Sequence, residues 1–366
     1  MSTPPPERPN LPPLQRSDLP YISSEIAPIA ARIKERPEDF RVHEIPAYPP
    51  TGSGDHLWVH FEKTNTTTEF AVKQLARALG IAPRDAGYAG MKDKHAITTQ
   101  WASFLFGKEE ALSNLDIPGL RILAVTRHAQ KLRTGHLRGN RFELVLRNVD
   151  ASRIDDAKEV LTRVRTLGMP NYFGAQRFGF DGRNTNEARA WIVDNGPAPR
   201  DMWKKKLLVS VLQSQVFNDV VASRIKDGLF AEAVDGDVLR KEDTGGLFTT
   251  SDLADAKKRV AEWAVSPTGP MFGDSMRAAE REALLRDEAA LLRAGLTHEH
   301  LKRFGSAGEG TRRVMRVRPD DITLETLDDT SLKLMFTLPK GAYATVLVRE
   351  ITKGEEPNLA SGDEHA

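Results

Sequence analysis

The chain of 366 residues contains no cysteine. Disulfide bonds, thiolate nucleophiles and cysteine-ligated metals are therefore excluded, and the composition fits a reducing compartment. No run approaches the roughly 18 apolar residues that a membrane-spanning helix needs, so we expect no membrane association. The start of the chain also lacks the apolar core of a signal peptide. Together these absences predict a cytoplasmic protein.

An excess of charge of one sign is also missing. The chain has 52 Lys and Arg residues against 51 Asp and Glu residues, a formal net charge of +1, so a site for a polyanion has to be a local patch. Its nine histidines form no His-Glu-x-x-His pattern. The glycine-rich segment 305–310 lacks the Gly-Lys-Ser/Thr ending of a phosphate-binding loop. We therefore expect no metal and no cofactor. We also expect a protein that acts as a monomer.

The length exceeds that of a usual single domain, so two domains are expected. Prolines crowd the beginning of the chain, which predicts a disordered leader over residues 1–26. A polar, disordered tail is predicted at 353–366. Strand-like alternation in 27–196 and 318–352 encloses a more helical stretch, 197–317. We predict that the two outer segments form one discontinuous domain and that 197–317 is inserted into it.

Apolar periodicity and capping signals predict several helices. Thr66 followed by Glu69 reads as a capping box, and Gly80 as a stop signal. The stretch 204–226 carries a strong apolar stripe and is expected to be amphipathic. The predicted helices cover residues 67–79, 152–167, 204–226, 252–264 and 275–294.

One stretch, Gly87 to Trp101, combines glycines, charge and an apolar run. Its two early glycines permit left-handed or crowded backbone conformations. Asp93 stands between Lys92 and Lys94, whose charges favour its ionised form. A carboxylate held beside ammonium groups suits a nucleophile or a transition-state stabiliser. A solvated surface turn is the simpler interpretation of this spacing taken alone.

A second stretch, from Ile117 to Phe142, contains no acidic residue. A solvated loop usually mixes charges of both signs, so an acid-free stretch of this length favours contact with phosphate groups. The candidate phosphate-binding cations are Arg127, Lys131, Arg133, Arg138 and Arg141.

A third stretch, Pro170 to Gly179, gathers aromatic residues, glycines and an arginine. It can form a tight turn in the core. It can also form a platform for an unstacked base, because stacking on an aromatic ring contributes about 1–3 kcal/mol per base.

The run from Tyr88 to Gln100 resembles the signature of the tRNA pseudouridine synthase D (TruD) family. Blocks at 33–44, 127–142, 171–179 and 336–350 are similar to the same family, and the resemblance is weakest at 228–310. The resemblance implies an α/β (α+β) pseudouridine synthase fold. In that fold a mixed, largely antiparallel sheet is flanked by helices and interrupted by an inserted α/β domain.

The resemblance also implies a function, the isomerisation of uridine at position 13 of certain tRNAs to pseudouridine. The reaction breaks the C1′–N1 bond and rejoins the base through C5, so neither a redox cofactor nor a metal is required. Asp93 is the implied catalytic residue. Its carboxylate can attack C1′, remove the C2′ proton or add to C6, and the sequence leaves these routes open.

The same resemblance implies a substrate pocket. Extruding a uridine costs a few kcal/mol, which stacking on Phe40, Phe173 and Tyr343 would offset. Asn171 would bond the Watson–Crick edge of the base, and Lys34 would offset negative charge on the departing uracil or anchor Asp93.

Two other functions are compatible with parts of the sequence. A non-catalytic RNA-binding or RNA-folding protein on the same scaffold would use the same aromatic residues and cations, and the intact Asp93 motif disfavours it. A glycosidase needs two carboxylates about 5–9.5 Å apart, whereas the motif surrounds Asp93 with lysines.

Overall fold

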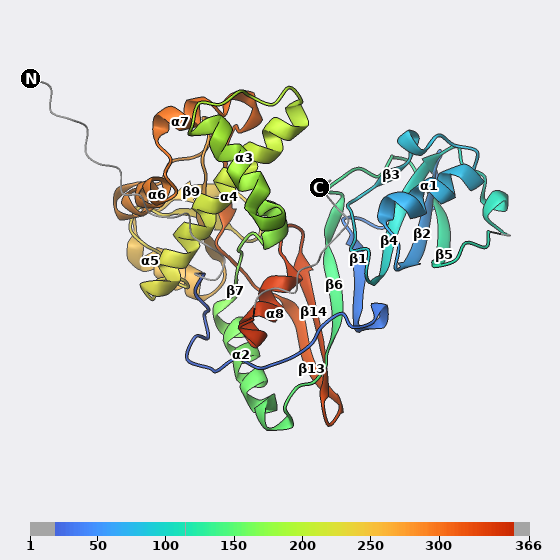
Figure 1. The fold of residues 1–366 in the computed structure, drawn as a ribbon, viewed down its shortest axis with the longest axis horizontal. Helices are drawn as coiled ribbons and strands as arrows, with labels where there is room; N and C mark the ends of the chain where they lie inside the picture. The colour runs from blue at the N-terminus through green and yellow to red at the C-terminus, as the bar shows by residue number, and fades with distance from the viewer. Residues whose placement is uncertain (1–18, 114, 355–366) are drawn as a thin grey trace, which may run out of the picture. The chain divides into compact units, whose positions relative to one another are not determined.

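The structure is a computed structural model that describes residues 19–113 and 115–354. The described chain packs into two compact units (Figure 1). Of the described residues, the first unit, here called the sheet unit, comprises 27–113, 115–162, 319–344 and 351–354. The second, here called the helical unit, comprises 19–26, 163–318 and 345–350.

The sheet unit is built on an eight-stranded sheet with the path β13-β14-β6-β1-β4-β2-β5, and β3 pairs with β4 outside that path. Strands β1 and β4 run parallel, whereas the other neighbouring pairs are antiparallel. This confirms the predicted mixed, largely antiparallel sheet. Its strands are β1 (Phe40–Pro46), β2 (His56–Thr64), β3 (Gly87–Tyr88), β4 (Ile97–Leu105), β5 (Leu120–His128), β6 (Leu137–Leu146), β13 (Asp320–Asp328) and β14 (Ser331–Pro339).

Helix α1 (Thr68–Ala78) covers one face of β2 and β4 (Figure 1). Its apolar stripe is fully buried against that face, in a core formed by Ala71, Val72, Leu75, Ala76, Leu57, Val59, Phe61, Ala102 and Phe104. Thr67 is the N-cap, because its hydroxyl accepts the N–H of Phe70. The predicted cap, Thr66, is therefore one residue too early. Gly80 ends the helix with a left-handed φ of 67°.

The helical unit combines helices with a small sheet of order β11-β10-β8-β9. Its strands are β7 (Met169–Pro170), β8 (Val238–Lys241), β9 (Leu247–Thr249), β10 (Val265–Met271), β11 (Thr311–Val314) and β12 (Arg316–Val317), of which β7 pairs with β12. Its helices are α3 (Arg183–Ile192), α4 (Met202–Lys226), α5 (Leu253–Ala261), α6 (Arg281–Arg293) and α7 (His298–Lys302). Helices α2 (Ile154–Leu167) and α8 (Ala344–Thr352) cross the boundary between the two units.

Helix α4 differs from the amphipathic helix predicted at 204–226. Its residues from Leu208 to Ala222 are buried, with one partly exposed position at Ser210. A helix enclosed by protein on most sides needs partners for its polar side chains. Gln213 donates to the carbonyl of Phe272, and the carboxylate of Asp219 accepts from Arg293 at 2.7 Å. The sequence periodicity did not distinguish this central helix from a surface one.

The predicted helix at 275–294 is also shorter in the structure. Helix α6 begins only at Arg281. Glu280, which immediately precedes this helix, donates its N–H to the carbonyl of Gly236 at 2.9 Å. Glu280, the N-cap of α6, has an extended backbone with φ −125° and ψ 167°, and the helical turns predicted before it do not form.

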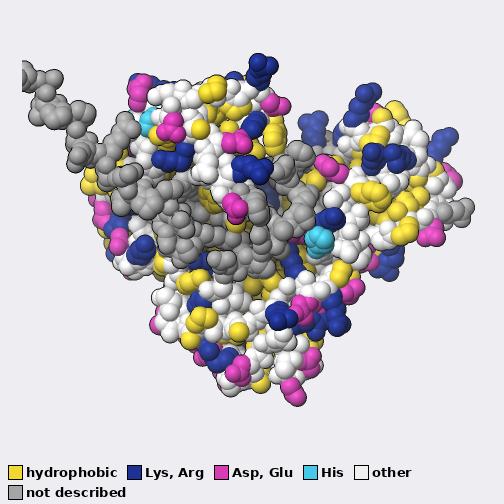
Figure 2. Space-filling model, viewed as in Figure 1, with side chains coloured by type: hydrophobic (Ala, Val, Ile, Leu, Met, Phe, Trp, Pro, Cys, Tyr) yellow, Lys and Arg dark blue, Asp and Glu magenta, His cyan; other side chains and the backbone are white. Residues whose placement is uncertain are grey.

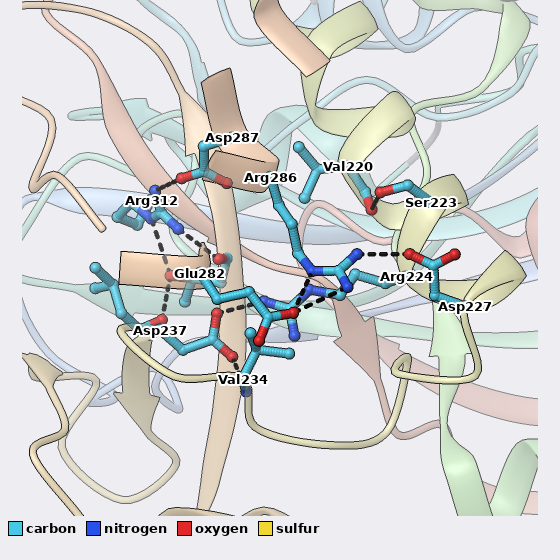
Figure 3. Close-up of polar contacts among 12 residues, drawn as sticks. Val220, Ser223, Arg224, Asp227, Val234, Asp237, Glu282, Arg286, Asp287 and Arg312 are labelled. Carbon is cyan, nitrogen blue, oxygen red and sulfur yellow. Dashed lines mark hydrogen bonds and ion pairs between the residues drawn. The ribbon is translucent and has the colours of Figure 1, made fainter. Parts of the chain in front are cut away.

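Buried ion pairs connect the elements of the helical unit (Figure 3). Arg224 of α4 pairs with Asp237, and Arg312 of β11 pairs with Asp287 of α6 at 2.7 Å. Burial raises the pKa of Asp287, and the nearby Arg312 charge opposes that shift. Removing one partner of such a pair leaves an uncompensated buried charge, so these pairs join α4, α6 and the sheet firmly.

Residues 163–196 pack within the helical unit. Arg189 of α3 donates to the carbonyl of Ala294 at 2.7 Å, and Arg303 donates to the carbonyl of Trp191 at 2.8 Å. The predicted start of the inserted segment, residue 197, therefore lies inside this unit, whereas its predicted end at 317 lies next to the boundary after Arg318. Whether 197–317 is a separate domain stays a prediction.

The predicted disordered leader does not extend to residue 26. Leu19 and Ile22 are buried, and the N–H of Ile22 donates to the carboxylate of Glu350. Arg349 lies over the ring of Tyr21 at 3.9 Å. These contacts hold residues 19–26 in the helical unit, because buried apolar side chains offset the entropy of ordering. Residues 1–18 and 355–366, the rest of the predicted leader and most of the predicted tail, lie outside the described residues.

The surface carries charges of both signs. On the face shown in Figure 2, Lys and Arg side chains lie among Asp and Glu side chains, in agreement with the net charge of +1. Within residues 19–113 and 115–354, no helix is both long enough and apolar enough to cross a membrane.

Candidate active site

The carboxylate of Asp93 pairs with an ammonium group from a distant part of the sequence. Nζ of Lys34 lies 3.3 Å from Oδ1 of Asp93. The Lys34 side chain is 9% exposed and the Asp93 side chain is 34% exposed. The anion is therefore accessible to a ligand, while its counter-ion is held inside the protein.

Backbone and ring contacts fix the position of Lys34. Its φ of 58° is left-handed, a rare conformation for a residue with a side chain. The ammonium lies 3.6 Å from the centre of the Phe40 ring, a cation–π contact. Phe40 stacks in turn on Phe142, which stacks on Phe336. Burial lowers the pKa of Lys34, and the charge of Asp93 opposes that shift.

Lys92, one of the two lysines next to Asp93, does not form the ion pair with Asp93. Lys92 is buried and pairs at 2.6 Å with Oε2 of Glu44, whose side chain is 1% exposed. The second carboxylate oxygen of Glu44 accepts the N–H of Trp101. The ion that pairs with Asp93 is instead Lys34, because Glu44 on β1 holds the Lys92 ammonium.

Three further hydrogen bonds fix the segment from Gly90 to Lys92. The hydroxyl of Thr68 accepts the N–H of Lys92 at 3.0 Å and donates to the amide oxygen of Gln100 at 2.8 Å. The amide nitrogen of Gln100 donates to the carbonyl of Gly90. The motif is therefore anchored to α1 and β4 immediately before Asp93.

The glycines of the motif differ from the left-handed turn that we considered. Neither Gly87 nor Gly90 is among the glycines with positive φ. Gly87 is required for close packing, since a Cβ there would lie 2.1 Å from the carbonyl oxygen of Leu132. A Cβ at Gly90 would meet no atom closer than 3.9 Å.

The loop that packs on Gly87 carries several of the predicted phosphate-binding cations. The N–H of Gly135 donates to the carbonyl of Ala89, and the N–H of Leu132 donates to the hydroxyl of Ser103, both at 2.8 Å. Arg133 and Arg138 are exposed on this loop and at the start of β6. The structure therefore attaches this loop, residues 129–136 and here called the basic loop, to the backbone of the Asp93 motif.

Two other predicted cations, Arg127 and Arg141, lie elsewhere on the sheet, whereas Lys131 belongs to the loop that packs on Gly87. Arg141 is exposed on β6 and Lys131 is partly exposed. Arg127, on the edge strand β5, donates to the carbonyl of Gly107 at 2.9 Å. The acid-free stretch is thus not one continuous surface, because β5 and β6 are separated by three other strands in the sheet.

The family-like block at 336–350 contacts the same loop. Strand β14 pairs with β6, and the N–H of Lys340 donates to the carbonyl of Arg138 at 3.1 Å. The Lys340 side chain donates to the carbonyl of Gly135. Tyr343, which is partly buried, follows three residues later in the sheet unit. Lys340 is an exposed cation at this loop that the sequence reasoning missed.

Asn171 and Phe173 form a cluster within the helical unit. The amide nitrogen of Asn171 donates to the carbonyl of Val314 at 2.9 Å, and its amide oxygen accepts from Arg313 at 2.6 Å. The guanidinium of Arg313 lies 4.1 Å from the centre of the Phe173 ring. The backbone of Phe173 exchanges two hydrogen bonds with the side-chain amide of Asn218. Both predicted residues are buried.

The predicted site residues therefore fall into two groups. Lys34 contacts both Asp93 and Phe40, and Tyr343 lies in the same unit. Asn171 and Phe173 belong to the other unit. The sequence analysis did not single out Arg313. In the sequence, it is only an arginine in a segment with strand-like alternation. In the described part of the chain, no group of three or more His, Asp or Glu side chains is placed to hold a metal ion.

Comparisons with known proteins agree on one family. The family profile described as tRNA pseudouridine synthase D (TruD) matches residues 17–198 and 201–351. The tRNA pseudouridine synthase D of Anaeromyxobacter sp. strain Fw109-5 is 48% identical over 342 residues, which cover 92% of this chain and 97% of the relative. The enzyme of that name from Thermus thermophilus is 39% identical over 338 residues, 92% of each chain.

The fold is also similar to a solved structure. A crystal structure of a Methanosarcina mazei protein assigned as a tRNA pseudouridine synthase D superposes with a TM-score of 0.73 at 21% sequence identity. The match covers 93% of this chain and 98% of the other.

Proposed function

The chain belongs to the tRNA pseudouridine synthase D (TruD) family, and we propose that it isomerises uridine in tRNA to pseudouridine with Asp93 as its catalytic residue. The observation that carries this proposal is the pair formed by the accessible Asp93 carboxylate and the buried Lys34 ammonium, 3.3 Å apart. The residue that the family motif implies as catalytic is thus the one with an accessible anion and a fixed counter-ion. The target that we propose, by analogy with the family, is uridine 13.

The reaction needs no group from outside the chain and the tRNA. The C1′–N1 bond breaks, the uracil turns, and C5 bonds to C1′, while the proton lost from C5 is balanced by the proton that N1 gains. Attack on C1′, removal of the C2′ proton and addition to C6 each use an ionised carboxylate. Asp93 has the exposure to reach the nucleotide by any of these routes.

Lys34 and Phe40 support the carboxylate. A fixed ammonium beside the reacting anion stabilises negative charge that develops on the departing uracil. Phe40 is 2% exposed and its ring is covered by the Lys34 ammonium. We therefore propose that Phe40 acts by holding Lys34 in place, instead of stacking on the base as the resemblance first implied.

The basic loop supplies the proposed contact with the RNA backbone. Arg133 on this loop and Arg138 at the start of β6 are exposed, and the loop is bonded to Ala89 of the Asp93 motif. Lys340 adds a third exposed cation through its bond to the same loop. Phosphate groups close to the target uridine are the partners that these charges suit.

The Asp93→Asn variant tests the assignment. The amide has nearly the shape of the carboxylate but no charge, so pseudouridine formation in tRNA should fall to background while tRNA binding persists. Asp85→Asn, an exposed carboxylate outside the motif, serves as the matched control. Substantial turnover by carefully purified Asp93→Asn protein would exclude Asp93 as the catalytic residue. Loss of turnover with retained binding also counts against a purely RNA-binding function.

A further inference from the structure

A second lysine, Lys63, binds the main chain of Asp93. Its Nζ donates to the carbonyl oxygen of Asp93 at 2.5 Å and to the carbonyl oxygen of Thr66 at 2.7 Å. The residue is 0% exposed. Asp93 is therefore held at both ends, by Lys34 at the carboxylate and by Lys63 at the main-chain carbonyl.

The geometry of β2 explains how Lys63 reaches Asp93. Lys63 pairs with Thr98 in the sheet, on the same face as the buried Val59 and Phe61. This is the face that α1 covers, and Thr66 immediately precedes Thr67, the N-cap of α1. The lysine thus ties Asp93 to the start of a helix that is packed on the sheet.

Two more contacts join the same turn to the residues after Asp93. The N–H of Asn65 donates to the carbonyl of Ala96 at 3.2 Å, and the amide oxygen of Asn65 lies 3.1 Å from Nδ1 of His95. Asn65 adopts a left-handed φ of 57°. The turn 63–66 and the segment 93–96 are therefore connected at three points, of which Lys63 is the buried one.

Burying the Lys63 ammonium costs free energy of desolvation, which a neutral side chain at this position would not cost. Removing a charge from water costs several kcal/mol. We propose that Lys63 is a positioning residue for the isomerisation: it fixes the main chain of Asp93 and so keeps the carboxylate in the reactive geometry. This inference rests on the proposed function of Asp93. A displacement of about 1 Å at a reacting group can lower a rate about 100-fold.

The test compares neutral replacements of Lys63 with a matched control. Lys63→Met and Lys63→Gln should lower kcat for pseudouridine formation by roughly 100-fold with little change in KM. Amide hydrogen exchange in segment 93–96 should become faster in both. The control is Lys73→Met on the exposed face of α1, which should leave kcat, KM and exchange unchanged. If Lys63→Met does not fold, Lys63→Gln, whose shorter side chain ends in a neutral amide, carries the comparison.

Restoring the ammonium separates positioning from packing. Because the chain contains no cysteine, Lys63→Cys can be aminoethylated at that one position while unfolded and then refolded. The product is nearly isosteric with lysine and should recover most of the lost kcat, whereas the unmodified Lys63→Cys chain should not. A neutral variant with unchanged kcat would overturn the proposal. So would an aminoethylated chain that is fully folded but no more active than unmodified Lys63→Cys.

Failure of this inference and failure of the proposed function give different results. If the unaltered chain forms no pseudouridine, the proposed function fails. Amide hydrogen exchange then tests, without any activity measurement, whether Lys63 fixes the main chain of Asp93. Unchanged protection of segment 93–96 in folded Lys63→Gln would overturn the positioning role.

Discussion

The buried ammonium of Lys92 lies 2.6 Å from Oε2 of Glu44, and the other carboxylate oxygen of Glu44 accepts the N–H of Trp101. This pair joins Glu44, the last residue of the family-like block at 33–44, to the Asp93 motif. The Lys34–Asp93 pair joins the same two blocks at a second point. Two blocks that are about fifty residues apart in the sequence are thus connected by two ion pairs, one buried and one accessible.

The Lys92–Glu44 pair leads to a prediction about stability. Lys92→Met should lower the free energy of unfolding of the sheet unit by about 3–5 kcal/mol, since Glu44 is left as an uncompensated buried charge. The double variant Lys92→Met/Glu44→Leu should regain most of that loss. Hydrogen exchange of amides in β1 and β4 measures the free energy of unfolding of the sheet unit alone.

The control for this prediction is Lys158→Met. Lys158 pairs with Asp155, and both side chains are exposed, so little change is expected. A Lys92→Met chain as stable as the unaltered protein would show that the pair does not hold the motif in place.

The position of Lys34 predicts an alkaline limit to activity. Burial lowers its pKa from the ordinary 10.5, so Lys34 loses its proton at a lower pH than a lysine in water. We expect kcat to fall on the alkaline side below pH 10.5, and Lys34→Arg to move that fall to higher pH, because arginine stays protonated. The folded chain releases this proton before the unfolded chain does, so unfolding free energy rises with pH between the two pKa values.

Profiles of kcat against pH, measured for both proteins with one tRNA preparation, check this prediction. Titration of the substrate is common to the two proteins and does not shift between them. Superimposable alkaline limbs would mean that the charge of Lys34 does not limit the reaction.

The basic loop predicts how tRNA binding depends on salt. The double variant Arg133→Glu/Arg138→Glu should weaken binding to tRNAs of different sequence alike and flatten the plot of log affinity against log salt. Two lost phosphate contacts correspond to a slope smaller by about 1.4–1.8. The matched control is Lys73→Glu/Arg84→Glu, which reverses two exposed charges elsewhere in the sheet unit. An equal change of slope in both variants would point to total charge as the cause.

The contacts of Asn171 predict that replacing it with alanine lowers the stability of the helical unit, in addition to any effect on substrate binding. In Asn171→Ala the carbonyl of Val314 loses a donor and Arg313 loses an acceptor. Loss of the donor to the Val314 carbonyl costs about 1–3 kcal/mol, whereas Arg313 keeps the main-chain carbonyl of Asn171 as an acceptor. Hydrogen exchange of β11 should therefore become faster.

Asn171→Asp separates these two contacts, because it keeps an acceptor for Arg313 and loses the donor to Val314. Its stability should lie between those of Asn171→Ala and the unaltered protein. If Asn171→Ala leaves exchange of β11 unchanged and affects only KM, Asn171 acts mainly on the substrate.

Local patterns were enough to predict many elements of the fold. Alternation predicted strands within 27–196, where β1 and β2 lie, and the apolar stripe with its stop at Gly80 located α1 to within one residue at each end. These predictions succeed because strand and helix periods are properties of short segments. The same information did not show that α4 is buried on nearly all sides, since that depends on which elements pack around it.

The sequence by itself determined the family of this chain and drew attention to Asp93, because thirteen consecutive positions, from Tyr88 to Gln100, carry the motif. Only the tertiary structure decided which charges accompany that carboxylate. Lys92, its neighbour in the sequence, pairs with Glu44, whereas Lys34 and Lys63 come from positions 59 and 30 residues away. Ion pairs depend on distance through space and on burial, which the order of residues along the chain does not specify.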